Sequence, residues 1–396
     1  MRIILVSTAG AGHVGPLLPV SAALARRGDE VTFVVPPTAA TLLEGQGFRV
    51  VTGVAPADEE LQPLWRSLAG ATEEVASAIV ERQIFAIRCT KAMLPSVSEI
   101  VREWGPDLVV REPCEYASGV TAFRRQIPLV TVAISFAATE WRVLDSVADI
   151  LDGHGPGLRQ FLGAAPFLTR LPESLDPSPF FLTQRYRELP MAADAATPAC
   201  PPVVGSRPLV YVTFGSLVGA LPEAARLFRM VLEAADGLDA RILFSVGREF
   251  EISSLGVLPA NVVVAPWVAQ EEVLAHCDAV LCHGGSGTAF GALAHGVPVG
   301  FVPLFADQPA NAYAVAGAGA GIVAEGVGAE SVSSRVAQVC APGLRAMVEA
   351  LLGERTYRDA ARRLGDELAA QPGVDDAVAR LAGWAADTNG LPGGGH

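Results

Sequence analysis

Two short apolar runs, each followed by a glycine-rich turn, constrain the fold more than any other feature of the chain. Ile3–Val6 leads through such a turn into a helical pattern from about Pro16 to Arg27. Leu209–Thr213 leads through another into a helical pattern over Pro222–Ala235. Short buried strands that alternate with helices are typical of βαβ units around a parallel sheet. The pattern therefore predicts an α/β protein with two doubly wound, Rossmann-like domains.

Further runs of the same kind predict the other strands. We expect them at Val31–Val35, Leu108–Val110, Leu129–Ala133, Arg241–Val246, Val262–Ala265, Ala279–Cys282 and Val299–Phe301. The segment 58–104 is largely helical in pattern, and a proline-rich stretch at about 195–208 reads as a linker. Since 396 residues suit two domains of the usual size, we expect domains over 1–200 and 208–372 and a last helix within 373–390.

The composition limits the partners. The net charge is −13 at pH 7, and no cluster of basic residues occurs, which argues against nucleic acid or an anionic membrane as the main partner. The longest uncharged stretch, 279–306, contains six glycines and two prolines, so it does not suit a membrane-spanning helix. The six cysteines form no Cys-x-x-Cys pair, which is typical of reduced thiols in a cytoplasmic protein. We expect small-molecule partners, and a homodimer is compatible with the sequence.

The first glycine-rich turn contains a candidate base. Gly10, Gly12 and Gly15 spell G-x-G-x-x-G, the spacing of a dinucleotide-binding loop. Such a loop needs an acidic residue at the end of the second strand, and that strand here ends in Val-Val-Pro-Pro. A dinucleotide-dependent oxidoreductase is therefore disfavoured. His13 lies inside the turn, where a neutral imidazole beside a helix N-terminus could act as a general base.

The segment from His283 to Thr288 predicts a phosphate site. It follows a predicted strand and opens a helix, so backbone N–H groups and two hydroxyls could surround a phosphate. No lysine follows the glycines, which excludes a Walker A loop. Neighbouring residues extend the candidate site: Ser216 could reach a phosphate, Trp267 and Gln270 suit a base, and Asp307 and Gln308 suit sugar hydroxyls. Trp267 could equally lie in the core, and Asp307 and Gln308 could equally cap a helix.

Two stretches together resemble a known family. They are PWVAQEEVLAHCDAVLCHGGSGTAFGALAHGVPVGFVPLFADQPANA, residues 266–312, and GHVGPLLPVSAALARRGDEVTFV, residues 12–34. Both are similar to the inverting GT-B glycosyltransferases that attach sugars from dTDP- or UDP-activated donors to bacterial natural products. The resemblance implies two Rossmann-like domains that face each other across a cleft. The N-terminal domain would bind the acceptor, the C-terminal domain the donor, and the last helix would pack back on the N-terminal domain.

The resemblance also implies roles for individual residues. His13 would deprotonate the acceptor hydroxyl, with Glu112 as its acidic partner and Glu115 as the alternative. An apolar acceptor would lie among aromatic residues of the N-terminal half, with Trp65, Phe85, Phe136 and Trp141 as candidates. The donor would be held by Ser216, Trp267, Val268, Gln270, His283, Gly285, Ser286, Gly287, Thr288, Asp307 and Gln308.

Position 291 bears on the donor. UDP-glucose-using relatives carry a glutamate eight positions after the phosphate-binding histidine, where it binds both ribose hydroxyls, whereas this chain has Gly291. We therefore expect a dTDP-sugar rather than a UDP-sugar. The chain has no Asp-x-Asp pair, so we expect neither a metal nor a cofactor. The alternatives are a nucleotide-sugar epimerase or hydrolase, and a non-catalytic GT-B-like partner of another transferase.

Overall fold

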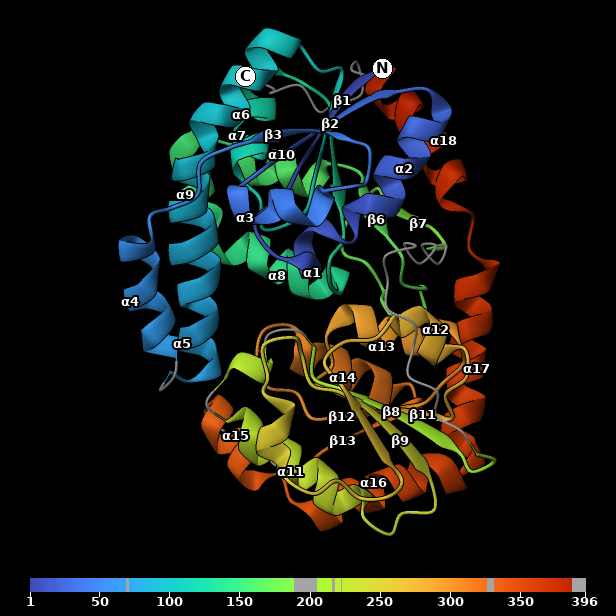
Figure 1. The fold of residues 1–396 in the computed structure, drawn as a ribbon. Coiled ribbons are helices and arrows are strands. Elements are labelled where there is room, and N and C mark those ends of the chain that lie inside the picture. Colours follow the sequence, from blue (N-terminus) through green and yellow to red (C-terminus); the bar gives the residue numbers. More distant parts are fainter. Residues whose placement is uncertain (69–70, 189–204, 216–217, 222, 326–330, 387–396) are drawn as a thin grey trace. The chain divides into compact units, whose positions relative to one another are not determined.

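The computed structural model describes residues 1–68, 71–188, 205–215, 218–221, 223–325 and 331–386. They form two compact units (Figure 1). The first contains residues 1–68, 74–188 and 371–386, and the second contains the described residues of 205–370 with 71–73. Most of the expected linker, and the end of the expected last helix, lie outside the described residues.

The first unit is built on a seven-stranded parallel sheet with the order β3-β2-β1-β4-β5-β6-β7. The strand order reverses between β1 and β4, which makes the carboxyl ends of these two strands the switch point where ligands bind in open α/β sheets. The strands are β1 (Arg2–Val6), β2 (Glu30–Val35), β3 (Arg49–Thr52), β4 (Leu108–Arg111), β5 (Leu129–Val132), β6 (Phe167–Thr169) and β7 (Thr183–Arg185).

Helices cover both faces of this sheet. Ile3 and Leu5 of β1 lie in a core shared with α2 and α18, whereas Ile4 and Val6 lie in a core on the opposite face, shared with α6 and α7. The alternation follows from the two-residue period of a strand. The helices are α1 (Ala11–Val14), α2 (Leu17–Arg27), α3 (Pro37–Ala40), η1 (Thr41–Leu43), α4 (Asp58–Leu68), α5 (Glu73–Ala78), α6 (Thr90–Trp104), α7 (Ala117–Arg125), α8 (Ala137–Ser146), α9 (Ala148–His154), α10 (Leu158–Ala164) and α18 (Val374–Ala386).

Helix α18 is the last helix among the described residues, and it packs within the first unit. Val374, Val378 and Leu381 are buried beside α2. Arg27 donates a hydrogen bond to the Val378 carbonyl at 2.6 Å, and Arg26 forms an ion pair with Asp375 at 2.8 Å. The helix is therefore held mainly by burial of its apolar side, since an exposed ion pair contributes little.

The segment 79–89 differs from a regular α-helix. Ile79–Cys89 (η2) has π-helical hydrogen bonding and lies between α5 and α6. Its Glu81 is buried and forms an ion pair with Arg142 at 2.9 Å. Phe85 belongs to the same segment. The sequence predicted this region as helical but gave no sign of the wider helix, because apolar spacing does not distinguish the two forms over so short a stretch.

The second unit repeats the arrangement with six parallel strands in the order β10-β9-β8-β11-β12-β13. Its switch point lies between β8 and β11. The strands are β8 (Leu209–Thr213), β9 (Arg241–Ser245), β10 (Val262–Ala265), β11 (Ala279–Cys282), β12 (Val299–Phe301) and β13 (Gly321–Val323).

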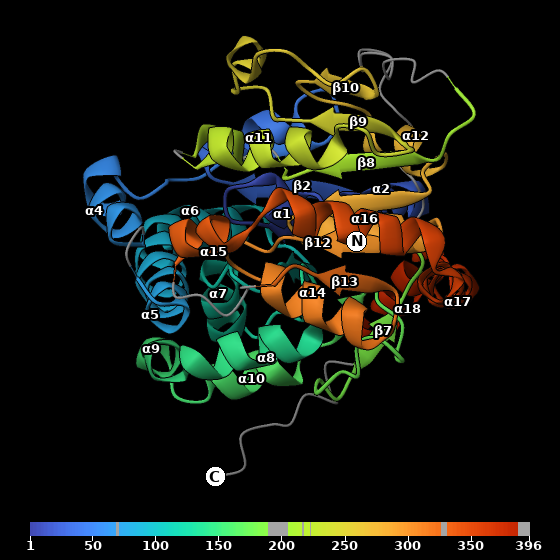
Figure 2. The ribbon, with the colours of Figure 1, turned by 90° about the horizontal axis from the view of Figure 1, so that it is seen from below.

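The helices of the second unit enclose its sheet, and Figure 2 shows α11 and α16 among them. A single core joins α11 and α16 to β8, β9 and β11. The helices are η3 (Val218–Ala220), α11 (Ala224–Ala235), η4 (Ile252–Leu255), α12 (Gln270–Leu274), α13 (Ser286–Ala294), α14 (Gln308–Gly317), α15 (Val332–Gln338), α16 (Ala341–Gly353) and α17 (Arg355–Ala370).

The predicted α/β fold with two parallel sheets is confirmed. Every strand predicted from an apolar run is present within one residue at each end, and β8, β10, β11 and β12 have the predicted limits. The sequence missed β3, β6, β7 and β13, which have three or four residues each. β7 reads Thr-Gln-Arg and contains no apolar residue, so hydrophobic patterning cannot find it.

Among the described residues, no single helix is long and apolar enough to cross a membrane. Helices α15 and α16 together meet the criteria of length and composition, but they bend by 76° at the break between them.

Candidate functional site

The first candidate site lies at the switch point of the first sheet. Val6 of β1 pairs with Arg111 of β4, so the two strands end at the same level. The residues that follow, Thr8 after β1 and Glu112 after β4, are therefore neighbours. Thr8 donates two hydrogen bonds to Oε1 of Glu112, from its backbone N at 3.0 Å and from its Oγ1 at 2.7 Å.

Glu112 is a fully buried carboxylate. Besides the Thr8 bonds, its Oε2 accepts a hydrogen bond from the backbone N of Cys114 at 2.6 Å and lies 3.3 Å from Nδ1 of His13. Burial alone would raise the pKa of Glu112, but the charge of His13 and the hydrogen bonds from His13 and Thr8 outweigh burial and bring the pKa to about 2. Glu112 therefore stays ionised at neutral pH.

His13 sits in the one-turn helix α1 directly after β1. Gly10, the residue directly before α1, has φ of 114°, a conformation that favours glycine. The His13 side chain is 20% exposed, and its ring lies tilted against Phe85, with 5.3 Å between ring centroids. Its Nδ1 faces the buried carboxylate, which leaves Nε2 as the nitrogen able to accept a proton.

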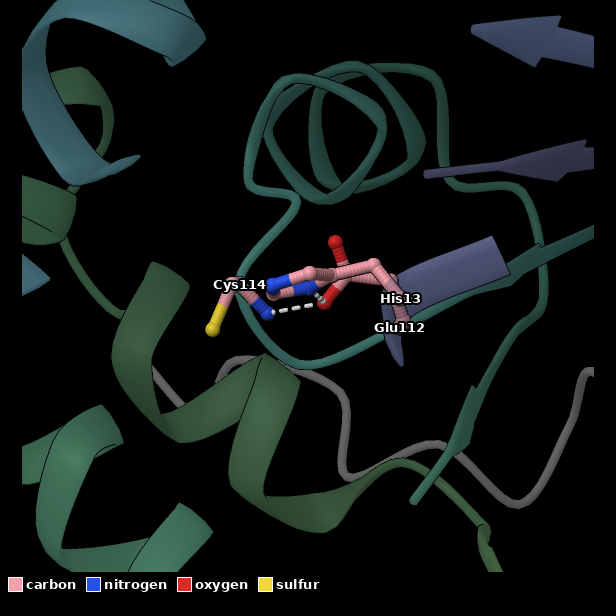
Figure 3. A group of neighbouring side chains, drawn as sticks. All are labelled: His13, Glu112 and Cys114. Atoms are coloured by element: carbon pink, nitrogen blue, oxygen red, sulfur yellow. Dashed lines mark hydrogen bonds and ion pairs between the residues drawn. The ribbon is translucent and has the colours of Figure 1, made fainter. Parts of the chain in front are cut away.

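Cys114 completes the group, which Figure 3 shows with its hydrogen bond and ion pair. His13, Glu112 and Cys114 each offer one ligand atom, and these atoms lie within 4.8 Å of one another, so the three could hold a metal ion. The Glu112 carboxylate does not need a metal to balance its charge, because Thr8, Cys114 and His13 already lie against its oxygens.

Glu115, the alternative partner of His13, is bonded elsewhere. Both of its carboxylate oxygens accept hydrogen bonds from Ser118, at 3.2 Å and 3.1 Å from the backbone N and also from its hydroxyl. Glu115 therefore caps the start of α7, and the geometry places Glu112 beside His13.

The four aromatic acceptor candidates have different surroundings. Phe85 lies against His13. Trp65 is 49% exposed on α4. Phe136 is buried in the core of the first unit, and Trp141 packs edge-on against Phe180 and under the guanidinium of Arg159. Of the four, Phe85 is the one whose ring lies against His13.

The second candidate site lies at the switch point of the second sheet. Thr213 of β8 pairs with Cys282 of β11, so the turn after β8 and His283 after β11 are neighbours. A Cβ added at Gly215 would lie 3.0 Å from Nε2 of His283, and one added at Gly285 would lie 2.5 Å from it. Two glycines thus give the imidazole its space.

Burial lowers the pKa of His283 to about 4, and the Asp307 charge and the Thr213 backbone only partly oppose this effect. The imidazole is therefore neutral at pH 7. It is followed by the start of α13, where Gly285 is the cap residue and offers no side chain to the first-turn N–H groups. Free N–H groups at a helix N-terminus bind phosphate well, and a neutral histidine can add one further donor.

Ser286 and Asp307 are joined by a hydrogen bond. Oγ of Ser286 donates to Oδ2 of Asp307 at 2.9 Å. Asn311, one helical turn after Asp307, donates from Nδ2 to the same Oδ2 at 2.9 Å and to the Gly284 carbonyl at 2.8 Å. The start of α14 is thus tied to the turn before α13.

The other residues that were predicted to bind the sugar donor have the following contacts. Oγ1 of Thr288 donates to Oε1 of Gln270 at 2.8 Å, and Nε2 of Gln270 donates to the Gly287 carbonyl at 3.3 Å. Gln308 is buried, and its Oε1 accepts hydrogen bonds from the backbone of Leu304 and Phe305. Val268 is buried, whereas Trp267 is 37% exposed, with the guanidinium of Arg248 4.9 Å from its ring centroid. Ser216 lies outside the described residues.

Sequence reasoning missed two residues of these sites, Cys114 and Asn311. The spacing Asp-Gln-x-x-Asn could have indicated Asn311, because residues four apart share one face of a helix. No sequence signal could have placed Cys114, because its position depends on the register of β1 against β4.

Replacement of Glu112 by glutamine should lower the free energy of unfolding of the first unit by about 3 kcal/mol at pH 7. The pKa of Glu112 is lower in the folded chain than its ordinary value of 4.5. Its contribution is therefore present above pH 4.5 and disappears as the pH falls toward 2. Urea unfolding of wild type and Glu112→Gln at pH 7, 5 and 3 measures this, with exposed Glu103→Gln as control. A difference between wild type and Glu112→Gln that does not shrink at low pH would contradict the prediction.

Comparison with known proteins identifies the family. Residues 229–383 match the family model described as "Erythromycin biosynthesis protein CIII-like, C-terminal domain". The chain is 30% identical over 399 residues to elloramycin glycosyltransferase ElmGT of Streptomyces olivaceus, covering 96% of this chain and 97% of that protein. It is 29% identical over 384 residues to L-demethylnoviosyl transferase of Streptomyces niveus, covering 94% of this chain and 95% of that protein.

The fold agrees with this relationship. The structure of spinosyn rhamnosyltransferase SpnG complexed with thymidine diphosphate is similar to this chain with a TM-score of 0.79 and 25% identity, covering 96% of this chain and all of that one. Two parallel doubly wound sheets are the GT-B architecture. The chain belongs to the family of bacterial GT-B glycosyltransferases that act on natural products.

Proposed function

We propose that this glycosyltransferase moves a sugar from a dTDP-sugar to a hydroxyl of an apolar natural-product acceptor, with inversion at the anomeric carbon and without a metal. The contact of 3.3 Å between His13 Nδ1 and the buried Glu112 carboxylate carries this proposal. A histidine oriented by a buried carboxylate is the arrangement that a general base requires.

The proposed reaction is one displacement. The acceptor oxygen bonds to the anomeric carbon as the bond from that carbon to the diphosphate oxygen breaks. The hydroxyl proton passes to Nε2 of His13, because Nδ1 faces Glu112. Glu112 then stabilises the imidazolium, and its lowered pKa keeps it ionised throughout. The products are the glycoside and dTDP.

The proposed donor site is in the second unit. The N–H groups at the start of α13 and the neutral His283 would bind the diphosphate, and they would stabilise the charge that develops on it as the sugar leaves. The exposed part of Trp267 would stack on the base. The thymidine diphosphate held by the related rhamnosyltransferase SpnG supports this class of nucleotide.

The surroundings of Gly291 bear on the choice of nucleotide. A Cβ at this position would lie 3.0 Å from Cδ1 of Leu274, so a glutamate here would require Leu274 to move. A deoxyribose lacks the 2′ hydroxyl that such a glutamate would bind. The glycine therefore favours dTDP over UDP.

The acceptor would lie in the first unit, next to His13. Phe85 is the aromatic residue that the geometry favours for contact with it, because its ring lies against the base. Trp65 is exposed on α4 and stays a candidate. The relative named elloramycin glycosyltransferase ElmGT supports a natural product as the acceptor class.

Loss of the proposed base should abolish most turnover without changing the affinity for the donor nucleotide. His13→Ala should lower kcat by about 10²–10⁴-fold, the usual contribution of a positioned general base, and leave the Kd for dTDP unchanged. Product formation and calorimetry measure the two quantities. His154→Ala, a histidine of α9 in the same unit, serves as the matched control. Turnover of the His13→Ala variant near the wild-type value would exclude the proposed role, and loss of activity on removal of metals with EDTA would exclude a metal-free reaction.

The wild-type chain should bind dTDP more tightly than UDP, because Gly291 leaves no carboxylate at that position for a 2′ hydroxyl. Titration calorimetry with each nucleotide at the same salt concentration measures the ratio of the two Kd values. Equal affinities, or tighter binding of UDP, would contradict the reading of Gly291 and leave the transferase activity intact.

Gly285→Ala should weaken dTDP binding by about tenfold or more, which corresponds to about 1.4 kcal/mol. The backbone of Gly285, with φ of −60°, suits alanine, so the expected cause is the added Cβ at 2.5 Å from Nε2 of His283. Gly353→Ala, where no atom lies within 4 Å of the added Cβ, is the control. An unchanged Kd in Gly285→Ala would place the diphosphate away from His283.

A further inference from the structure

Two segments approach each other closely in the second unit, the turn after β11 and the start of α14. Gly284 has φ of 90°, and a Cβ added there would lie 2.9 Å from the backbone oxygen of Gln308. Both the positive φ and the short approach require glycine at this position. The proposed phosphate turn and the segment that carries Asp307 are thus in direct backbone contact.

Asn311 links these two segments with one amide group. It is completely buried, and its Nδ2 lies 2.8 Å from the Gly284 carbonyl, 3.1 Å from Oγ of Ser286 and 2.9 Å from Oδ2 of Asp307. All three partners accept hydrogen bonds from this nitrogen. If the amide were rotated by 180°, its oxygen would face these three oxygens instead. The orientation of the amide is therefore determined by its surroundings.

This link commits the hydroxyl of Ser286. Its proton goes to Oδ2 of Asp307 at 2.9 Å, and its oxygen accepts from Asn311. A hydroxyl has one proton to donate. In this arrangement Ser286 therefore acts on Asp307 rather than on a phosphate, and the phosphate would be bound by the helix N-terminus and His283.

The same link holds one carboxylate oxygen of Asp307 by hydrogen bonds and leaves the other oxygen available to a ligand. Oδ2 accepts from both Ser286 and Asn311, whereas Oδ1 has no hydrogen bond to any residue that the structure describes. The side chain is partly exposed. A carboxylate held by one oxygen presents the other in a defined direction, which suits the hydroxyls of a sugar.

The backbone before Asp307 is also strained. Ala306 has φ of 57°, in the left-handed region that alanine seldom adopts. A residue keeps such a conformation when its surroundings hold it there, and strain of this kind is concentrated at functional sites. Asp307 accepts hydrogen bonds from Ser286 and Asn311 on the C-terminal side of this residue. The Gln308 side chain adds two more, from the backbone of Leu304 and Phe305.

We propose that Asn311 is a positioning residue of the donor site. It fixes Asp307 so that Oδ1 receives a sugar hydroxyl, and it joins this carboxylate to the phosphate turn through Gly284 and Ser286. The ligand class is the hexose of a nucleoside diphosphate sugar. The inference rests on the proposed function, since it requires that the second unit bind such a donor.

Calorimetry with two probes tests the proposal. dTDP reports on the phosphate turn, and dTDP-glucose reports on the turn together with the sugar contact. Asp307→Ala should lower the affinity for dTDP-glucose by about tenfold, the loss expected for a charged hydrogen bond, and leave dTDP unaffected. Asn311→Leu, of similar volume, should weaken both probes by about tenfold or more, because the turn and the carboxylate both lose their common anchor.

The double variant gives the decisive result. If Asn311 acts through Asp307, then Asp307→Ala should cost dTDP-glucose affinity in the wild-type background and almost none in the Asn311→Leu background. Additive losses would overturn the proposal. Ser286→Ala, which leaves Asn311 in place, should lower the affinity for dTDP-glucose more than that for dTDP. The opposite order would show that Ser286 serves the phosphate directly and would also overturn the proposal.

A matched control separates positioning from general stability. Asn261 is a second asparagine anchor of this unit, partly buried, and its Nδ2 donates to the carbonyls of Ala235, Leu238 and Ala240. Asn261→Leu should lower the melting temperature without changing either Kd. Wild-type affinities in a folded Asn311→Leu variant would refute the inference alone. Failure of the wild-type chain to bind dTDP would instead refute the proposed donor site.

Discussion

The parallel arrangement of the strands is the constraint on which both candidate sites depend. In a parallel sheet, the carboxyl ends of neighbouring strands lie at one edge, and where the strand order reverses, the loops after two strands have no helix between them. The first unit has β1 and β4 at that point, and the second has β8 and β11. His13 and Glu112 follow the first pair, and Gly215 and His283 follow the second. The chain thus uses one architectural rule twice.

The two sites differ in the charge state of their buried titratable residue. In the first unit, donors surround a buried carboxylate and keep it charged, with a pKa of about 2. In the second unit, burial keeps a histidine neutral, with a pKa of about 4. Both states fit the proposed roles. A permanent anion would support a base that gains a proton, and a neutral histidine would donate to a diphosphate that must leave after reaction.

The sequence predicted the larger features and the residue types of both sites. Strands such as β8 and β11 are continuous apolar runs because both faces of the sheet are covered, and such runs are visible in a sequence. Contacts set by register were not visible. The resemblance implied Glu112 as the partner of His13 with Glu115 as the alternative, and the level at which β1 and β4 end explains why Glu112 faces His13. That Gln308 holds the backbone of Leu304 and Phe305 follows from the path of one loop. Neither can be obtained from spacing alone.

The π-helical segment Ile79–Cys89 has a consequence for how this chain could change its acceptor. Phe85 reaches His13 from a helix with more residues per turn than an α-helix. Deleting one residue ahead of Phe85 would turn its side chain around the helix axis by the rotation of one residue, and so away from His13. The sheet, Glu112 and His13 would keep their positions. If Phe85 contacts the acceptor as proposed, insertions and deletions in this segment change the acceptor site more directly than substitutions do.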